Sequence, residues 1–286
     1  MINIKDFIFE KEKLSENIVI KSKNNIDYIQ FKVLLDYGIQ HAYILKPYTF
    51  GLNKLVTDDE NIKIAMKDYK KVCETLNLDF NKFCAPRQNH TGNVEIIDCK
   101  KIEQCPVFMD EKLNDIDGVI TNEKGIILAT INADCNLLLM YDPVKNVIAN
   151  VHSGWRGTVK KIGVKTVEKM INEYGCNPQD IICCICPSIR KCHFQVEEDV
   201  KNAFVREFGY TGKTDKFLEY IGKKDDIDKW LIDSVFVIKT VLKEVGLQEK
   251  NIIDCGLCSV CNNKYLYSFR VDENKKGRNS AIISIL

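Results

Sequence analysis

The chain has 286 residues, of which 45% are hydrophobic and 28% are charged, and its 41 basic and 40 acidic side chains leave a net charge of +1. This composition is typical of a folded globular protein and excludes disorder and collagen-like order. Because the net charge is close to zero, it gives no long-range attraction for a polyanion, and nucleic acid is not expected as a partner.

In chain order, hydrophobic periodicity predicts mainly strands in the first half, over 17–21, 27–33, 93–98, 118–121, 125–131 and 147–151, with a helix over 58–76. The second half predicts helices over 157–174, 197–208 and 230–245, and strands over 181–185, around 252, and over 265–271 and 280–285. No repeat or low-complexity linker interrupts them. The expectation is one mixed α/β or α+β domain over residues 1–286, with residues 1–35 as a candidate strand-rich appendage.

The N-terminus indicates where the protein works. The first ten residues, MINIKDFIFE, interleave charged and apolar side chains and do not resemble a signal peptide. No stretch approaches the roughly 20 apolar residues needed to span a bilayer. We therefore expect a cytoplasmic protein that does not enter the membrane, in which the 13 cysteines are free thiols or metal ligands and do not form a disulfide framework.

Three borderline or soft metal ligands lie in short polar segments beside predicted strands. His90 follows a Cys-Ala-Pro turn, Cys135 follows the strand over 126–131, and His152 ends the strand over 147–151. Strand ends that run into loops can bring side chains to a common point. Imidazole and thiolate suit zinc, and three protein ligands leave one position open, where the pKa of a bound water can fall to about 7. The alternative is that each residue has a separate structural role.

A second set of cysteines has metal-like spacing. Cys255, Cys258 and Cys261 are separated by two residues each, and four further cysteines lie upstream, at 183, 184, 186 and 192. Two-residue gaps are typical of structural zinc and iron–sulfur sites. However, neighbouring residues of the strand over 181–185 point to opposite faces and cannot all bind one ion. Burial as small apolar side chains is the favoured interpretation.

Arginine is scarce, since only six of the 41 basic residues are Arg. Arg87, Arg156, Arg270 and Arg278 all lie in or next to the polar segments. A chain that otherwise uses Lys is expected to keep Arg where a planar, bidentate donor binds phosphate or carboxylate. Arg156, Arg270 and Arg278 are therefore candidate phosphate ligands, with loop-locking ion pairs as the alternative role.

Taken together, the segments RQNHTGNV, DGVITN, NADCNLLLMYDP, NVHSGWRGTV, CPSIRKCHFQVEEDV and YSFRVDENKKGRNSAIISI resemble the YfiH family, which was labelled polyphenol oxidase or laccase-domain and is now regarded as purine nucleoside-processing enzymes. The resemblance runs from about His41 to Leu286. It implies a sheet-on-sheet core flanked by helices, related to deamidating toxins. It also implies that His90, Cys135 and His152 bind a catalytic zinc.

The resemblance further implies an activity. Members of this family phosphorolyse adenosine, inosine, guanosine and methylthioadenosine to the base and ribose 1-phosphate, and deaminate adenosine. In this interpretation Cys135 and Asp134 are catalytic residues, and Asp134 carries a proton; the alternative for Asp134 is that it caps the turn and orients Cys135. Gln88 and Lys46 join the arginines as candidate substrate- or phosphate-binding residues, although the family usually has Arg near the position of Lys46.

Other functions remain open. A multicopper phenol oxidase is less favoured, because a four-copper centre needs more imidazoles than the four present. A metal-independent thiol hydrolase would use Cys135 as the nucleophile and His90 or His152 as the base. A non-catalytic binding module would bind metal without turning over any nucleoside.

Overall fold

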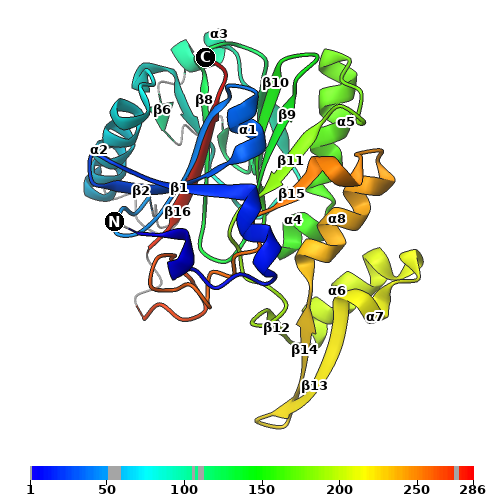
Figure 1. Cartoon of the computed structure of the whole chain (residues 1–286). Coiled ribbons are helices and arrows are strands. Elements are labelled where there is room, and N and C mark those ends of the chain that lie inside the picture. Colours follow the sequence, from blue (N-terminus) through cyan, green and yellow to red (C-terminus); the bar gives the residue numbers. More distant parts are fainter. Residues whose placement is uncertain (1, 51–58, 105–106, 109–112, 274–276) are drawn as a thin grey trace.

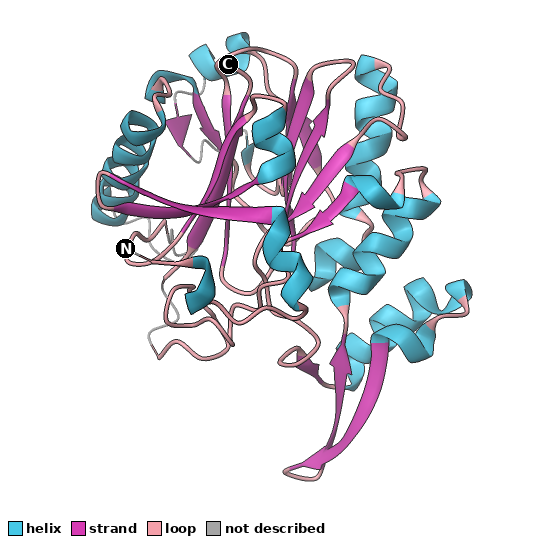
Figure 2. Cartoon of the chain, viewed as in Figure 1, coloured by secondary structure: helices cyan, strands magenta, loops and turns pink. Residues whose placement is uncertain are grey.

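Two large β-sheets face each other at the centre of the molecule, and helices cover their outer sides (Figures 1 and 2). This computed structural model describes residues 2–50, 59–104, 107–108, 113–273 and 277–286. Within these residues, no helix has the length and apolar content that crossing a membrane requires.

The first sheet, sheet A, is mixed and joins the two ends of the chain. Its strand order in the described residues is β1-β2-β3-β16-β8-β4-β6. The strands are β1 (Ile18–Lys23), β2 (Ile26–Phe31), β3 (Gln40–Ile44), β4 (Phe83–Ala85), β6 (Val107–Phe108), β8 (Ile127–Asn132) and β16 (Asn279–Ser284). The C-terminal strand β16 lies between β3 and β8 and pairs antiparallel with both. The early strands β1 and β2 form the edge next to β3.

The second sheet, sheet B, has the order β15-β11-β9-β10-β7-β5 in the described residues. Its strands are β5 (Val94–Ile96), β7 (Gly118–Thr121), β9 (Asn136–Asp142), β10 (Val147–Ser153), β11 (Ile182–Ile185) and β15 (Ile252–Asp254). β9 and β10 form an antiparallel hairpin at its centre. β5 and β15 are added in parallel at its two edges.

Strand alternation explains why the sheets stack. On β9, Leu137, Leu139 and Tyr141 belong to the core between the sheets, which also contains Ile29, Tyr43, Leu128 and Ile283 of sheet A. The intervening Leu138 and Met140 belong to the core beneath the outer helices. When both faces of a strand contact apolar neighbours, its sequence is a continuous run of apolar residues, and β9 has such a run.

The helices pack on the outer face of each sheet. On sheet B lie α5 (Ile162–Tyr174) and α8 (Ser234–Glu244), through Val167, Met170, Ile238 and Leu242. On sheet A lies α2 (Asp59–Leu76), through Tyr69, Val72 and Cys73. Two short helices, α1 (Lys32–Asp36) and α3 (Cys99–Gln104), connect strands. The helix–sheet–sheet–helix arrangement confirms the predicted sheet-on-sheet core flanked by helices.

A small third sheet projects from the sandwich as an arm (Figure 1). Its order is β12-β14-β13, with β12 (Gln195–Val196), β13 (Leu218–Lys224) and β14 (Ile227–Ile232). The helices α6 (Glu198–Phe208) and α7 (Thr214–Phe217) pack on it, and Phe204, Phe208 and Phe217 form its buried core.

Three predicted elements need correction. The helix over 157–174 is two helices, α4 (Trp155–Val159) and α5, because Lys161 adopts a left-handed conformation with φ 56°. The predicted helix over 230–245 starts inside β14, and its helical part begins only at Ser234, where Asp233 accepts a hydrogen bond from the Phe236 N–H at 2.8 Å. The predicted strand over 265–271 is a series of turns.

Candidate metal centre and active site

His90, Cys135 and His152 meet at one end of the sandwich. His90 lies in the connection from β4 to β5, and Cys135 in the connection from β8 to β9, so both are on segments that cross from sheet A to sheet B. His152 is on β10 of sheet B. The ligand atoms of the three residues lie within 4.8 Å of one another, and Cys135 Sγ is 3.8 Å from His90 Nε2. The three side chains predicted to converge therefore do so, and the cluster could hold a metal ion.

The buried carboxylate of Asp117 organises both histidines, and sequence reasoning missed it. His152 Nδ1 donates to Asp117 Oδ1 at 2.7 Å, which leaves Nε2 of that ring available to a ligand. The backbone N–H groups of Asn89, His90 and Thr91 also donate to this carboxylate, at 3.1, 2.9 and 2.7 Å. These bonds hold His90 in a left-handed conformation with φ 59°. A histidine that donates its second N–H to a carboxylate is a recurrent partner of zinc.

Gly154 leaves the space in which the three ligands converge. A Cβ at this position would lie 2.6 Å from His90 Cδ2, 3.1 Å from Cys135 Sγ and 3.4 Å from His152 Cε1. Its backbone, with φ −63° and ψ 170°, is ordinary extended chain. The glycine is therefore required by close approach and not by its conformation.

The electrostatics of the cluster favour a thiolate beside a charged imidazole. Burial raises the pKa of Cys135, but the charge and hydrogen bond of His152 outweigh it and lower the pKa to about 6. Burial lowers the pKa of His152, but the Cys135 thiolate and the Asp117 carboxylate raise it to about 9. Burial likewise raises the pKa of Asp117, and its bonds to His152 and Thr91 lower it to about 2. The protein thus prepares the thiolate that a metal or a reaction would use.

Hydrogen bonds to the backbone fix the loop that carries Cys135. The Asn132 side-chain amide donates to the carbonyls of Cys135 and Pro187, at 2.6 and 2.9 Å, and accepts from the Tyr43 hydroxyl at 2.9 Å. Gln88 extends β8, since its side chain both donates to the carbonyl of Ile131 and accepts from its N–H, each at 2.7 Å. Gln88, predicted as a substrate ligand, therefore has both of its amide groups engaged.

Asp134 also has partners on both carboxylate oxygens. Oδ1 accepts from the Ser259 hydroxyl at 2.6 Å, and Oδ2 accepts from the Arg270 N–H at 2.8 Å. Its backbone is left-handed, with φ 84°. These bonds fit its predicted alternative role, in which it shapes the turn before Cys135.

The candidate phosphate ligands differ in their surroundings. Arg278 is half-buried, and its guanidinium lies 5.8 Å from the centre of the Phe269 ring. Burial lowers the pKa of Arg278 below its ordinary value, whereas the negative charges of Cys135 and Asp134 raise it. Arg156 is exposed and stacks on Trp155 at 4.2 Å. The charge of Arg278 therefore interacts with Cys135 of the ligand cluster.

Arg270 and Lys46 are engaged elsewhere. The guanidinium of Arg270 donates to the carbonyls of His193 and Gln195, at 3.1 and 3.0 Å. Lys46 donates to the Asn263 carbonyl at 2.7 Å and pairs with Asp272 at 3.3 Å. Both side chains therefore tie loops together at this end of the molecule.

Most of the remaining thiols are buried, as expected. Cys183, Cys184 and Cys186 lie in or just after β11 and are fully buried, and burial raises the pKa of each. Cys255 faces the buried Arg190, 3.5 Å from its guanidinium. These four thiols belong to no candidate metal cluster within the described residues.

Comparison with known proteins identifies the family of this chain. Residues 42–286 match the family model described as "Multi-copper polyphenol oxidoreductase laccase". The chain is 29% identical to the purine nucleoside phosphorylase YlmD of Bacillus subtilis (strain 168), over 84% of each protein. It is 28% identical to the adenosine deaminase RL5 of an unknown prokaryotic organism, over 68% of this chain and 72% of that protein.

The fold is similar to that of a solved structure. The crystal structure of the hypothetical protein YfiH of Bacillus licheniformis superposes with a TM-score of 0.79 and 22% identity, over 91% of this chain and 96% of that one. At this identity the likeness concerns the fold. Since the family model covers most of the sequence, the chain belongs to the laccase-domain family that includes YfiH and YlmD.

Proposed function

We propose that the protein is a zinc-dependent enzyme of purine nucleosides. It would phosphorolyse adenosine, inosine, guanosine and methylthioadenosine to the base and ribose 1-phosphate or methylthioribose 1-phosphate, and deaminate adenosine. The observation that carries the proposal is the convergence of His90, Cys135 and His152 around Gly154. The names of its relatives, purine nucleoside phosphorylase and adenosine deaminase, support the substrate class.

The donor set fits zinc. Two imidazoles and one thiolate, without a carboxylate among them, suit a borderline divalent ion. When bound, zinc would act as a Lewis acid and lower the pKa of a bound water. The chain's own residues prepare this site: Asp117 orients His152 and the loop of His90, and His152 keeps Cys135 ionised.

Copper chemistry fits less well. A multicopper centre needs many imidazoles, and the chain has four histidines. His41 is buried in sheet A, where its Nδ1–H donates to the Ile39 carbonyl at 2.9 Å and its Nε2 accepts from the Phe31 N–H at 2.7 Å. Burial lowers its pKa to about 4. His193 lies with Cys192, Cys258 and Cys261, so only His90 and His152 of the four histidines lie beside Cys135.

We assign orthophosphate binding first to Arg278. It is half-buried, and its charge is coupled to Cys135 and Asp134. A guanidinium beside the ligand cluster would hold the anion through bidentate hydrogen bonds while the glycosidic bond breaks. Arg156 is the second candidate, because its side chain is exposed. A ligand-binding role for Arg270, Lys46 and Gln88 stays a prediction. Each of these side chains already bonds to other groups of the protein, which favours a role in positioning the loops around the site.

Asp134 as a proton carrier in deamination also stays a prediction. Both of its oxygens accept hydrogen bonds, from the Ser259 hydroxyl and the Arg270 N–H. An ionised carboxylate next to Cys135 would accept a proton and return it to the leaving amine.

The metal-independent thiol hydrolase remains the second candidate. The bond between His152 and Asp117 and the low pKa of Cys135 resemble the arrangement that activates a nucleophilic cysteine. In that reaction the Cys135 thiolate would attack the substrate, and a chelator would leave the activity intact.

The deciding experiment combines metal analysis with turnover. The purified protein is assayed with adenosine and inosine, with and without phosphate, before and after chelation, alongside His90→Ala, His152→Ala and the distant control Cys99→Ser. We expect phosphate-dependent base release and phosphate-independent inosine formation from adenosine, both lost on chelation and in the two histidine variants. Full turnover after complete metal removal would reject the zinc enzyme in favour of the thiol hydrolase.

A further inference from the structure

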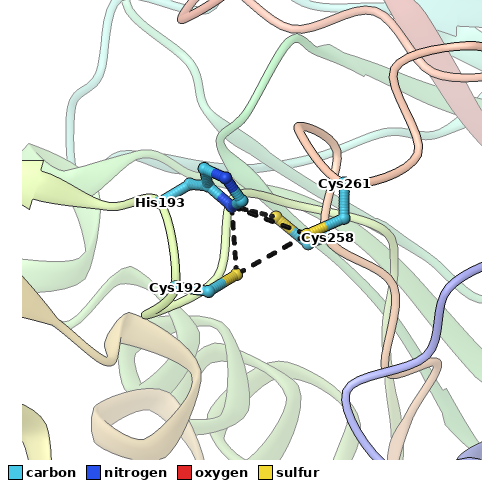
Figure 3. A group of neighbouring side chains, drawn as sticks. All are labelled: Cys192, His193, Cys258 and Cys261. Atoms are coloured by element: carbon cyan, nitrogen blue, oxygen red, sulfur yellow. Dashed lines mark hydrogen bonds between the residues drawn. The ribbon is translucent and has the colours of Figure 1, made fainter.

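A second group of ligand-type side chains lies away from the site described above. Cys192 and His193 are in the turn between β11 and β12, and Cys258 and Cys261 are in the turn after β15 (Figure 3). His193 Nδ1 lies 3.2 Å from Cys192 Sγ, 3.7 Å from Cys258 Sγ and 3.5 Å from Cys261 Sγ. The sulfurs of Cys192 and Cys261 are 3.9 Å apart.

Hydrogen bonding alone does not account for this arrangement. One imidazole nitrogen carries either one proton or one lone pair, so Nδ1 of His193 can make one good hydrogen bond and not three. All three thiols nevertheless face it, as Figure 3 shows. The side chains are arranged around a shared point and not as a chain of donors and acceptors.

The distances match those around a tetrahedral zinc ion. Zinc–sulfur bonds of about 2.3 Å and zinc–nitrogen bonds of about 2.0 Å place two sulfurs roughly 3.8 Å apart, and a sulfur and a nitrogen roughly 3.5 Å apart. The observed sulfur–sulfur distance is 3.9 Å, and the sulfur–nitrogen distances are 3.2, 3.5 and 3.7 Å. Because the ligand atoms all lie within 4.8 Å of one another, the space suits one ion and not an iron–sulfur cluster.

We propose that Cys192, His193, Cys258 and Cys261 form a second, structural zinc site. Four protein ligands, three thiolates and one imidazole, complete a tetrahedron and leave no open position, which distinguishes this site from the three-ligand site at His90. The sequence supplies the ligands as an adjacent Cys-His pair and a Cys-x-x-Cys pair. The favoured sequence interpretation of these cysteines, burial as apolar side chains, holds for Cys255, the β11 thiols and Cys258, whereas Cys192 is exposed and Cys261 is half-buried.

The position of the site explains what it would stabilise. Ser259, between two of the ligands, donates to Asp134, which precedes Cys135 of the first site. The His193 carbonyl accepts from the Arg270 guanidinium, and the Arg270 N–H donates to Asp134. The ion would therefore close a ring of contacts that joins both ligand loops to the base of the Cys135 loop. This role does not depend on which reaction the first site catalyses.

The test counts zinc in each site separately. The purified 286-residue protein, its Cys192→Ser, Cys258→Ser and Cys261→Ser variants, His90→Ala and the exposed control Cys99→Ser are dialysed against limited zinc and analysed for zinc and protein. We expect two zinc ions per chain in the wild type and in Cys99→Ser, and one in each of the others. Loss of all zinc in His90→Ala, or two ions per chain in all three serine variants, would overturn the proposal.

A spectroscopic measurement keeps the test independent of folding defects in the serine variants. The His90→Ala protein, loaded with one zinc ion, is examined by X-ray absorption at the zinc edge. We expect three sulfur ligands and one nitrogen ligand. A sulfur count of one or none would reject the site, and so would a Cys192–Cys261 disulfide found by mass spectrometry in protein purified without oxidant.

Discussion

The Nδ1 atom of His152 lies 2.7 Å from Oδ1 of Asp117, and the same carboxylate receives the backbone N–H of His90. One buried acid therefore orients a ligand on β10 and a ligand loop that crosses between the sheets. Its low pKa, about 2, means that it stays ionised throughout the neutral range. The geometry of the candidate metal site thus depends on a residue that is not one of the three candidate ligands.

Asp117→Asn should weaken metal binding about 10- to 100-fold, as loss of such a supporting carboxylate does elsewhere. The amide keeps the shape but brings an N–H₂ group toward backbone N–H donors. Zinc affinity is measured by competition with a coloured chelator. The matched control is Asp115→Asn, because Asp115 is exposed and its side chain accepts only from Asn89 among the hydrogen bonds described. Equal affinities of the two variants would contradict the prediction.

Gly154→Ala should disrupt the ligand cluster by sterics alone, since Ala tolerates the backbone angles at that position. The new methyl group would overlap His90 and Cys135. Overpacking of this kind costs about 1–3 kcal/mol, which corresponds to roughly 5- to 150-fold in metal affinity. Gly209→Ala is the control, because its nearest neighbour would be Val205 at 3.8 Å. Retention of wild-type affinity in Gly154→Ala would show that the ligands converge differently.

Metal-free Cys135 should react with iodoacetamide at unusually low pH. Its pKa is about 6, so the thiolate forms as the pH rises through 6, and alkylation should reach a plateau that extends to about pH 9, where His152 loses its proton. Peptide mass spectrometry at a series of pH values measures the rate, with the buried Cys183, of pKa about 12, as the unreactive reference. Added zinc should protect Cys135. Half-maximal reactivity near the ordinary value of 9 would refute the predicted ion pair.

Asp254→Ala should destabilise the fold by about 3–5 kcal/mol, because it leaves the buried guanidinium of Arg190 with the exposed Glu10, 3.9 Å away, as its remaining ionic partner. Asp254 pairs with Arg190 at 2.8 Å and Lys239 at 2.7 Å, and both Asp254 and Arg190 are nearly inaccessible to solvent. Burial raises the pKa of Asp254, but Arg190 and Lys239 hold it below its ordinary value of 3.8. Its stabilising contribution is therefore complete above pH 4 and is lost only as the pH falls further.

Urea unfolding measures this loss. Asp215→Ala, which removes an exposed pair with Lys216, should change stability by no more than about 1 kcal/mol. A similarly small effect of Asp254→Ala would show that Arg190 finds another partner.

The fold was predictable from the sequence where apolar residues alternate or recur with a clear period. The predicted strands over 118–121 and 147–151 match β7 and β10 closely. Strand β9 was missed because Leu137 to Met140 is a continuous apolar run with no alternation to reveal it. A strand was wrongly predicted over 265–271, where the sequence alternates but the backbone forms turns. Asp272 accepts a hydrogen bond from the Ser268 N–H and stabilises one of these turns.

The ligand cluster could be predicted because His90, Cys135 and His152 each stand beside a predicted strand end. Asp117 was in view in the segment DGVITN, and an acid directly before a buried strand was the available signal. The grouping of Cys192 and His193 with Cys258 and Cys261 could not be predicted, because a separation of 65 residues between His193 and Cys258 carries no periodicity. The parallel pairing of β11 with β15, continued by the bridge between Ser188 and Cys258, brings the two turns together.

The four imidazoles have distinct environments, so each one is a local reporter. His41 is a neutral ring inside sheet A, His90 and His152 face Cys135, and His193 faces three thiols. In a nitrogen NMR spectrum selective for histidine rings, each of the two clusters and the sheet core would give separate signals. Titration with zinc should shift the signals of three rings and leave that of His41 in place, which makes the unresponsive ring an internal standard for the other three.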